Sequence, residues 1–313
     1  MNAIVEFPTL SIGKTYTQLE LEYDKELKTL FSWMKPYPRP CFTATLLQEV
    51  QHVERLLEAN QGHINHCGRP EQVAYLVAGS KADGAFNLGG DLNMFIEAIL
   101  RKDRELLLGY GRLCVENIHR RLTGIGANIP TIALVQGKCF GGGFECALTS
   151  EIIVAERCAT FSFPEILFNM IPGMGGLLLL KRRVGLKKAE EIIMSGRVFT
   201  AAEMYDMGVV DLLAEDACGV TAVRQHIQHR LRKPVAYRTM FQAKQVSDPV
   251  SRDQLQDIVE LWVDAALELE TRDLRMMSRL LRGQDRMISA DAEDIGVDTL
   301  YSAIPLAVAV GAD

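Results

Sequence analysis

The sequence predicts an α/β protein in which parallel strands alternate with helices. Short apolar runs of strand type recur along the chain, and most are followed by a stretch whose apolar residues keep the 3.6-residue period of a helix. The strand at 131–136, the glycines at 141–143 with a helix to residue 150, and the strand at 152–156 show this order over the shortest distance. Such alternation favours parallel pairing with right-handed crossovers.

The first part of the chain is expected to hold two strands and one helix. The strands span residues 19–23 and 29–34, and the proline-rich segment 35–40 separates them from the helix. That helix runs to Asn60, with Thr45 and Gln48 as a capping box. We expect the polar segment 61–72 to be a loop.

The remaining elements complete the alternation and define three parts of the chain. We assign the core to residues 1–215, a helical region to 216–285, and leave 286–313 unassigned. The expected elements are a strand at 74–78, a loop at 80–90, a helical stretch at 91–122 interrupted near 101–103, helices at 177–195 and 200–207, a strand at 209–214, and mostly helix to residue 284.

Composition narrows the class of protein. The 313 residues include 24% charged residues and carry a net charge of −6, which is typical of an ordinary enzyme and argues against a nucleic-acid partner. Seven scattered cysteines without CxxC spacing indicate a reducing compartment. The sequence contains no apolar run of the roughly 18 residues that a membrane span needs. We therefore expect a cytoplasmic protein without a membrane span.

Common cofactor and metal motifs are absent from the sequence. There is no phosphate-binding glycine loop, no serine-hydrolase elbow and no zinc-protease motif. His63 and His66 stand beside Cys67 and could in principle bind a metal, but a solvated loop is the better interpretation. We predict neither a metal nor a cofactor.

Two glycine-containing junctions between a strand and a helix are candidates for an anion site. Gly89 lies in the first and Gly142 in the second, where backbone N–H groups are free and the helix dipole favours negative charge. Two N–H donors facing one spot would stabilise a carbonyl oxygen as it gains charge. The alternative is that these glycines only permit tight turns and close helix packing.

Two carboxyl groups follow these junctions in apolar surroundings. Glu145 lies one turn inside the helix after Gly142, and Glu165 follows Pro164 in an apolar segment. Burial destabilises the ionised form of a carboxyl group, so both are candidates for proton transfer. Ordinary surface acids are the alternative for either residue taken alone.

Residues 137–145, 163–166 and 172–176 resemble the signature of the enoyl-CoA hydratase (crotonase) superfamily, and the resemblance is strongest from 74 to 215. Within it the chain looks closest to bacterial diffusible-signal-factor synthases, on segments 38–42, 86–92, 132–137, 143–145 and 164–169. The resemblance implies a spiral of repeated ββα units over 1–215, with helices over 216–285 that mediate trimerisation and enclose an acyl tail. It also implies a homotrimer.

The resemblance also implies roles for the site residues. Leu88 and Gly142 would donate N–H groups to the oxyanion, with Gly89 adjoining, and Glu145 and Glu165 would be the acid/base pair. Such enzymes dehydrate a 3-hydroxyacyl group on acyl carrier protein to a cis-2-enoyl group and then hydrolyse the thioester. By hypothesis Glu165 removes the Cα proton, while Glu145 assists loss of the hydroxyl and later activates water.

The acyl tail is expected to contact the C-terminal helices. Trp262, Met276 and Leu280 resemble tail-pocket positions of signal-factor synthases, Met174 would line the opposite side, and Gly141 would also contact substrate. The alternative is that these side chains only pack the helices against the core or a neighbouring subunit.

Three functions remain open at this stage. Besides the signal-factor synthase there is a plain enoyl-CoA hydratase or isomerase, and, from another class, a regulatory protein on the same fold that binds a sensor kinase. The carrier is acyl carrier protein or coenzyme A. Cys139 and Phe140 replace the small pair usual before the triple glycine and could narrow the pocket.

Overall fold

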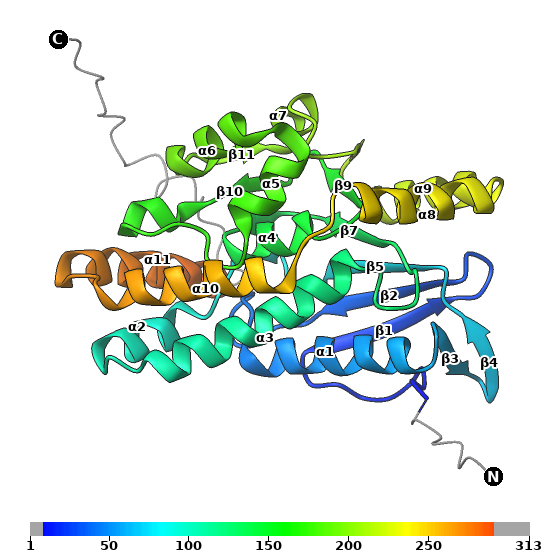
Figure 1. The fold of residues 1–313 in the computed structure, drawn as a ribbon, viewed down its shortest axis with the longest axis horizontal. Helices are drawn as coiled ribbons and strands as arrows, with labels where there is room; N and C mark the ends of the chain where they lie inside the picture. Colours follow the sequence, from blue (N-terminus) through cyan, green and yellow to red (C-terminus); the bar gives the residue numbers. More distant parts are fainter. Residues whose placement is uncertain (1–8, 291–313) are drawn as a thin grey trace.

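Two sheets organise the computed structural model, which describes residues 9–290 (Figure 1). The larger has the order β1-β2-β5-β7-β9-β12 and the smaller β11-β10-β8-β6, and a separate hairpin pairs β3 with β4. The strands are β1 Leu19–Asp24, β2 Thr29–Met34, β3 His63–His66, β4 Arg69–Gln72, β5 Tyr75–Ser80, β6 Ala85–Asn87, β7 Thr131–Val135, β8 Lys138–Phe140, β9 Ile152–Glu156, β10 Thr160–Ser162, β11 Phe199–Thr200 and β12 Leu212–Ala214.

A repeated ββα unit builds both sheets. In the pairs β5–β6, β7–β8 and β9–β10 the first strand joins the larger sheet and the second joins the smaller one. Consecutive units are parallel in both sheets, whereas β1 and β11 pair antiparallel at the edges. The predicted α/β class and the spiral of ββα units are therefore confirmed.

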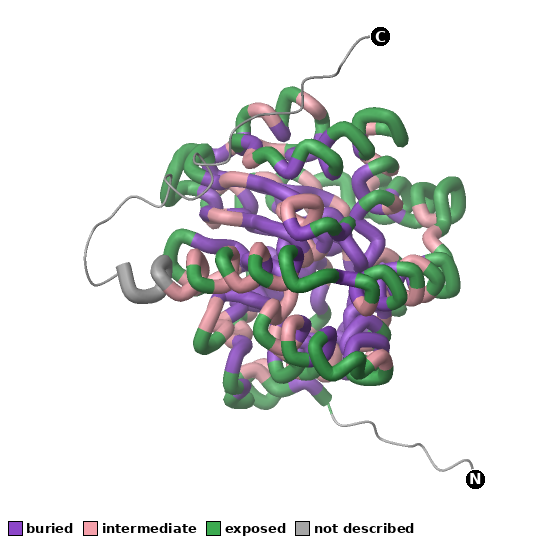
Figure 2. The backbone as a smooth tube through the Cα atoms, turned by 90° about the vertical axis from the view of Figure 1, so that its left-hand side faces the viewer, coloured by how far each residue is buried: buried purple, intermediate pink, exposed green. Residues whose placement is uncertain are grey.

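Helices pack against the sheets and against one another. Helix α10 packs along α3, and α11 packs on α2 and on the 3-10 helix η1 (Figure 1). Buried segments run through the strands and along the inner faces of the helices (Figure 2). The helices are α1 Ala44–Ala59, α2 Leu92–Leu100, α3 Arg104–Leu122, α4 Gly142–Leu148, η1 Pro164–Phe168, α5 Gly176–Val184, α6 Leu186–Ser195, α7 Ala201–Asp206, α8 Gly219–Leu231, α9 Pro234–Ser247, α10 Arg252–Leu267 and α11 Thr271–Ala290.

Two local predictions in the first part of the chain are wrong. Thr43, not Thr45, caps α1, because its hydroxyl accepts the Leu46 N–H at 3.0 Å and no capping box with Gln48 forms. The polar segment 61–72 is a hairpin, not a loop. Its turn is made by Cys67 and Gly68, whose φ angles of +52° and +76° suit a two-residue hairpin turn.

Of the other predictions on the chain's organisation, one is confirmed and one falls partly outside the described residues. The helical interruption near 101–103 is confirmed, since Asp103 caps α3 directly after α2 ends. Of the unassigned segment 286–313, residues to Ala290 belong to α11, and 291–313 lie outside the described residues. No helix within residues 9–290 combines the length and apolarity needed to cross a membrane.

Candidate active site

Three chain segments that matter for function meet at one edge of the smaller sheet. Strands β6, β8 and β10 are parallel neighbours, with Asn87 opposite Cys139 and Phe140 opposite Ser162. Because the carboxyl ends of parallel strands lie at the same edge, the three segments that follow these strands come together there. These are the turn 88–91, the glycines 141–143 and the start of η1 with Glu165.

The N–H groups of Leu88 and Gly89 are occupied within the protein. Leu88 donates to the carbonyl oxygen of Pro40 at 2.7 Å, and Gly89 donates to Asn87 Oδ1 at 2.8 Å. Neither is available to a substrate oxygen in this arrangement, although both residues line the cavity described below. This corrects the expectation that Leu88 donates its N–H to the oxyanion, with Gly89 adjoining it.

The next residue, Gly90, is better placed for that task. An ideal Cβ on Gly142 would lie 3.5 Å from the Gly90 nitrogen, so the two backbone segments are adjacent. Within residues 9–290 neither the Gly90 N–H nor the Gly142 N–H donates a hydrogen bond to another protein group. Both line the cavity. The pair Gly90 and Gly142 therefore forms the candidate oxyanion hole.

Close backbone approach explains the glycine run 141–143, with which α4 begins. A Cβ on Gly143 would lie 2.1 Å from the carbonyl oxygen of Asn87, which is far inside contact distance. Gly141 has φ of +52°, and a Cβ there would lie 2.6 Å from Glu165 Oε1. Because these glycines have no side chains, the backbones of the two strand–helix junctions and the Glu165 carboxyl group can lie close together.

Glu145 is buried, with 2% of its surface exposed, and is held by backbone donors. Its Oε1 accepts the N–H groups of Met174 and Gly176, each at 2.8 Å. Burial raises the pKa of Glu145 to about 7, and the two N–H bonds oppose that rise. The turn 172–176 therefore orients this carboxyl group as well as lining the site.

Fewer hydrogen bonds hold the carboxyl group of Glu165 than that of Glu145. Its Oε2 is inaccessible and has no hydrogen-bond partner within the described part of the chain. Burial raises the pKa of Glu165 to about 8, and the nearby Glu145 adds to the rise through charge repulsion. With these pKa values the two carboxyl groups together hold about one proton between pH 7 and 8. Such a pair can accept one proton and donate another.

One cavity of about 290 Å³ contains all of these groups. The ten residues predicted for catalysis, the oxyanion and substrate binding all line it, and so does Gly90. The predicted residues are Leu88, Gly89, Gly141, Gly142, Glu145, Glu165, Met174, Trp262, Met276 and Leu280.

The side chains expected to hold the acyl tail also have structural contacts. The Trp262 ring meets the Phe95 ring edge to face, with centroids 5.1 Å apart. A Cβ on Gly173 would lie 2.4 Å from Trp262 Cγ, so this turn fits closely over the indole. Met276 and Leu280 are half-buried on α11. Packing and tail binding are thus compatible for Trp262, and its role with substrate stays a prediction.

The sequence interpretation missed a second part of the cavity, formed by facing surfaces of α3 and α4. Its lining residues share small or polar side chains in the protein interior. They are Cys114, Asn117 and Arg121 on α3, Cys146 on α4, and Thr149 directly after the end of α4. Their helical spacing was the available signal, because polar residues recur there on an otherwise apolar face.

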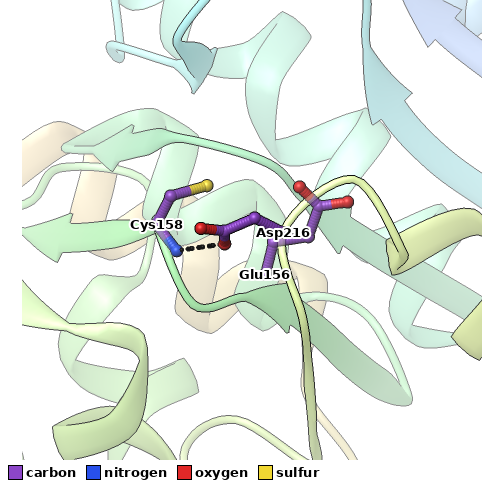
Figure 3. Close-up of side chains that lie close together, drawn as sticks. All are labelled: Glu156, Cys158 and Asp216. Carbon is purple, nitrogen blue, oxygen red and sulfur yellow. Dashed lines mark hydrogen bonds between the residues drawn. The ribbon is translucent and has the colours of Figure 1, made fainter.

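Outside the cavity, three residues bring together side-chain atoms that could in principle hold a metal ion (Figure 3). They are Glu156, Cys158 and Asp216. Glu156 Oε1 accepts the Gly219 N–H at 2.8 Å, and Asp216 Oδ1 accepts the Cys158 N–H at 2.8 Å. These bonds join the end of β9 to the start of α8. His63 and His66 on β3 are not part of any such cluster among residues 9–290.

Comparison with known proteins identifies the family. The sequence model of the enoyl-CoA hydratase/isomerase family matches residues 63–275, which is more than half of the chain. The chain therefore belongs to the enoyl-CoA hydratase/isomerase family.

Curated relatives match over part of their length. A probable enoyl-CoA hydratase of Mycobacterium bovis is 40% identical over 103 residues, which cover 31% of this chain and 40% of that protein. A probable enoyl-CoA hydratase of Bacillus subtilis is 30% identical over 166 residues, covering 53% and 62%. The chain thus spans less than two thirds of the length of these relatives.

Solved structures share the fold. An enoyl-CoA hydratase/isomerase of Xanthobacter autotrophicus Py2 superposes with a TM-score of 0.69 at 20% identity, over 90% of this chain and all of that chain (100%). DspI of Pseudomonas aeruginosa gives a TM-score of 0.65 at 24% identity, over 80% of this chain and 90% of that chain. These similarities establish the architecture.

The coupled carboxyl pair predicts a bell-shaped pH dependence of kcat/KM. Below the pKa of about 7 both carboxyl groups gain protons and the base is lost, and above about 8 the last proton leaves and the acid is lost. Activity is therefore expected to peak between these values and to fall on both sides. Initial rates with an acyl thioester across this range measure the profile, and a flat profile would contradict the pair.

Proposed function

We propose that the protein makes a cis-2-unsaturated fatty acid from a 3-hydroxyacyl thioester. The observation that supports this most is the convergence of two carboxyl groups, the buried Glu145 and the half-buried Glu165, with the free N–H groups of Gly90 and Gly142 in one cavity. A thioester carbonyl placed against the two N–H groups would be stabilised as an enolate and as a tetrahedral oxyanion. One site would thereby serve both half-reactions.

The dehydration step follows from where each carboxyl lies. Glu165 Oε1 is beside Gly141 and hence beside the oxyanion pair, so we assign it the Cα proton. Glu145, held by Met174 and Gly176, gives a proton to the departing 3-hydroxyl, which leaves as water. This step uses the singly protonated form of the pair in which the proton is on Glu145 and Glu165 is ionised, which is the minor form because the pKa of Glu165, about 8, is above that of Glu145, about 7. The Cα–H and C–O bonds break, and the double bond forms between the two carbons. No covalent bond to the protein is needed.

The hydrolysis step reuses the same groups. Glu145 takes a proton from a water molecule that attacks the thioester carbonyl, and the resulting oxyanion lies between the N–H groups of Gly90 and Gly142. The C–S bond of this oxyanion then breaks, and the proton taken up by Glu145 passes to the departing sulfur, which releases the free acid and the carrier thiol. The resemblance of segments 86–92 and 164–169 to signal-factor synthases favours this second step over a plain hydratase. Acyl carrier protein is the proposed carrier on the same ground.

Product analysis tests the proposal. Purified protein is incubated with 3-hydroxydecanoyl-carrier protein and, separately, with the coenzyme A thioester, and the products are identified by mass spectrometry and chromatography against cis and trans standards. We expect free cis-2-decenoic acid from the carrier-protein substrate. An accumulating trans-2-enoyl thioester without free acid would instead favour the plain enoyl-CoA hydratase.

The C-terminal helix is proposed to limit the length of the acyl chain. Filling the cavity at Leu280 with Leu280→Trp is expected to shift preference toward shorter chains by roughly 10- to 200-fold per one or two methylenes excluded, the range that hydrophobic pockets give. The profile of kcat/KM against chain length measures this. An unchanged profile with a lower melting temperature would mean that Leu280 only packs α11 against the core.

A further inference from the structure

Three hydrogen bonds hold the first of the two strand–helix junctions in place. The Leu88 N–H donates to the carbonyl oxygen of Pro40, and the Gly89 carbonyl oxygen accepts the Phe42 N–H, each at 2.7 Å. The third bond runs from the Gly89 N–H to Asn87 Oδ1 at 2.8 Å. Of these three bonds, only the third involves a side chain, that of Asn87.

These bonds determine where the Gly90 N–H points. Gly89 and Gly90 are joined by a trans peptide bond, in which the carbonyl oxygen and the N–H point in opposite directions. Because the Gly89 oxygen is turned toward the Phe42 N–H, the Gly90 N–H is turned away from it. The bond to Asn87 Oδ1 holds the preceding peptide, that of Leu88 and Gly89. The direction of the Gly90 N–H is therefore fixed by the peptides on both sides of Gly89.

Without the Asn87 contact, the glycine at position 89 would let this junction change shape. Gly89 has φ of +103°, and glycine can move between positive and negative φ at little cost. If Asn87 Oδ1 were absent, the buried Gly89 N–H would lack this acceptor, and the backbone would be expected to rotate toward another one. Such a rotation would redirect the Gly90 N–H, which follows directly in the chain.

Asn87 also lies against the second junction. It is the last residue of β6 and has none of its surface exposed (0%). A Cβ on Gly143 would lie 2.1 Å from the Asn87 carbonyl oxygen and 3.0 Å from its Cβ, and Gly143 directly follows Gly142. Asn87 does not line the cavity. It therefore touches both backbone segments that present the free N–H groups without facing a substrate itself.

We propose that Asn87 is a positioning residue of the oxyanion hole. Its Oδ1 holds the Gly89 N–H, and this contact keeps the Gly90 N–H directed at the carbonyl oxygen of the acyl group. The inference rests on the proposed function, since it requires that a thioester carbonyl bind between Gly90 and Gly142. It adds to the mechanism a side chain that acts only through the backbone.

Two substitutions of Asn87 isolate the effect of its side-chain oxygen. Asn87→Ala removes the acceptor, whereas Asn87→Ser keeps an oxygen that can accept the N–H two residues later. The chain already contains such a contact at the end of β5, where Ser80 Oγ accepts the Ala82 N–H at 3.1 Å. Ser80→Ala is the matched control, because it deletes the same kind of contact at a residue that does not line the cavity.

We expect Asn87→Ala to lower kcat for dehydration and hydrolysis by roughly 10- to 100-fold, because a displacement of about 1 Å in a catalytic site can cost about 10²-fold. KM should change little, since the hydrogen bonds of an oxyanion hole strengthen mainly in the transition state. Asn87→Ser and Ser80→Ala should keep most of the activity. Initial rates with 3-hydroxydecanoyl-carrier protein measure this, with circular dichroism to confirm folding.

Infrared spectroscopy measures the contact itself, independently of turnover. The probe is a decanoyl-pantetheine analogue that is isotope-labelled at the carbonyl carbon, with a methylene group in place of the thioester sulfur so that it is not hydrolysed. The stretching frequency of a carbonyl group falls when it accepts stronger hydrogen bonds. We expect a lower frequency on the wild type and on Asn87→Ser than on Asn87→Ala.

A measurement on the wild type alone covers the case in which Asn87→Ala does not fold. Amide NMR of the glycine-labelled protein gives the resonances of Gly89 and Gly90 with and without the analogue. We expect the Gly90 amide proton to shift on binding and that of Gly89 to stay, because Asn87 retains the Gly89 N–H. A shift of Gly89 in place of Gly90 would overturn the inference.

The outcomes separate the inference from the proposed function. Equal carbonyl frequencies and equal kcat in the wild type and Asn87→Ala overturn the inference and leave the proposed oxyanion hole standing. An equal loss in Asn87→Ser and Asn87→Ala also overturns it, because the side-chain oxygen is then not the cause. If the analogue does not bind the wild type, or if its bound carbonyl frequency matches that in an apolar solvent, the proposed oxyanion hole fails together with the inference.

Discussion

Replacing Glu145 or Glu165 by glutamine is expected to lower the rate of dehydration by roughly 10²- to 10⁴-fold, because an amide keeps the shape of the carboxyl group but cannot transfer a proton. Folding should be little changed. In Glu145→Gln the amide oxygen can still accept the N–H groups that Met174 and Gly176 donate to the native carboxyl group. Initial rates with 3-hydroxydecanoyl-carrier protein measure the effect.

Glu156→Gln is a matched control for these two substitutions. Glu156 is also buried and also accepts a backbone N–H, that of Gly219, but it lies outside the cavity. We expect this variant to retain activity while showing a comparable change in melting temperature. Normal turnover in either Glu145→Gln or Glu165→Gln would remove that residue from the mechanism.

Gly142→Pro is expected to reduce dehydration and thioester hydrolysis together by roughly 10²- to 10³-fold, because it deletes one of the two proposed oxyanion donors. Gly142 is the first residue of α4, a position where proline removes no intrahelical hydrogen bond. Rates of both half-reactions, with circular dichroism to confirm folding, measure the result.

Gly142→Ala separates the loss of the N–H from the added volume. A Cβ at this position would meet its nearest neighbours at 3.5 Å, which is ordinary contact, and alanine keeps the N–H. We expect the alanine variant to retain most of its activity. A proline variant that lost only one of the two activities would indicate separate sites for the two reactions.

Much of the fold could be predicted because its signals are local. Residues 29–34 form a buried strand at the predicted positions, and Asp103 marks the break between α2 and α3 as a helix N-cap. The strands β6, β8, β10 and β11 were missed, since segments of two or three residues are too short to show a period.

As with the fold, those parts of the candidate site that depend on neighbouring residues could be predicted from the sequence, and those that depend on contacts distant in the chain could not. The motif around Glu145 and Glu165 pointed to the residues that line the cavity. Which N–H group is free at the first junction could not be derived from it, because the Leu88 N–H is taken by Pro40, nearly fifty residues earlier in the chain.

Exchange of the Cα hydrogen with solvent tests the central assignment most directly, since it isolates proton removal from loss of the hydroxyl and from hydrolysis. A saturated decanoyl-carrier protein, which lacks a 3-hydroxyl group, is incubated with the protein in deuterium oxide, and deuterium at Cα is measured by mass spectrometry. The account predicts exchange by the wild type and by Glu145→Gln, and its loss in Glu165→Gln. Exchange that persists in Glu165→Gln, or that is absent from the wild type, would contradict it.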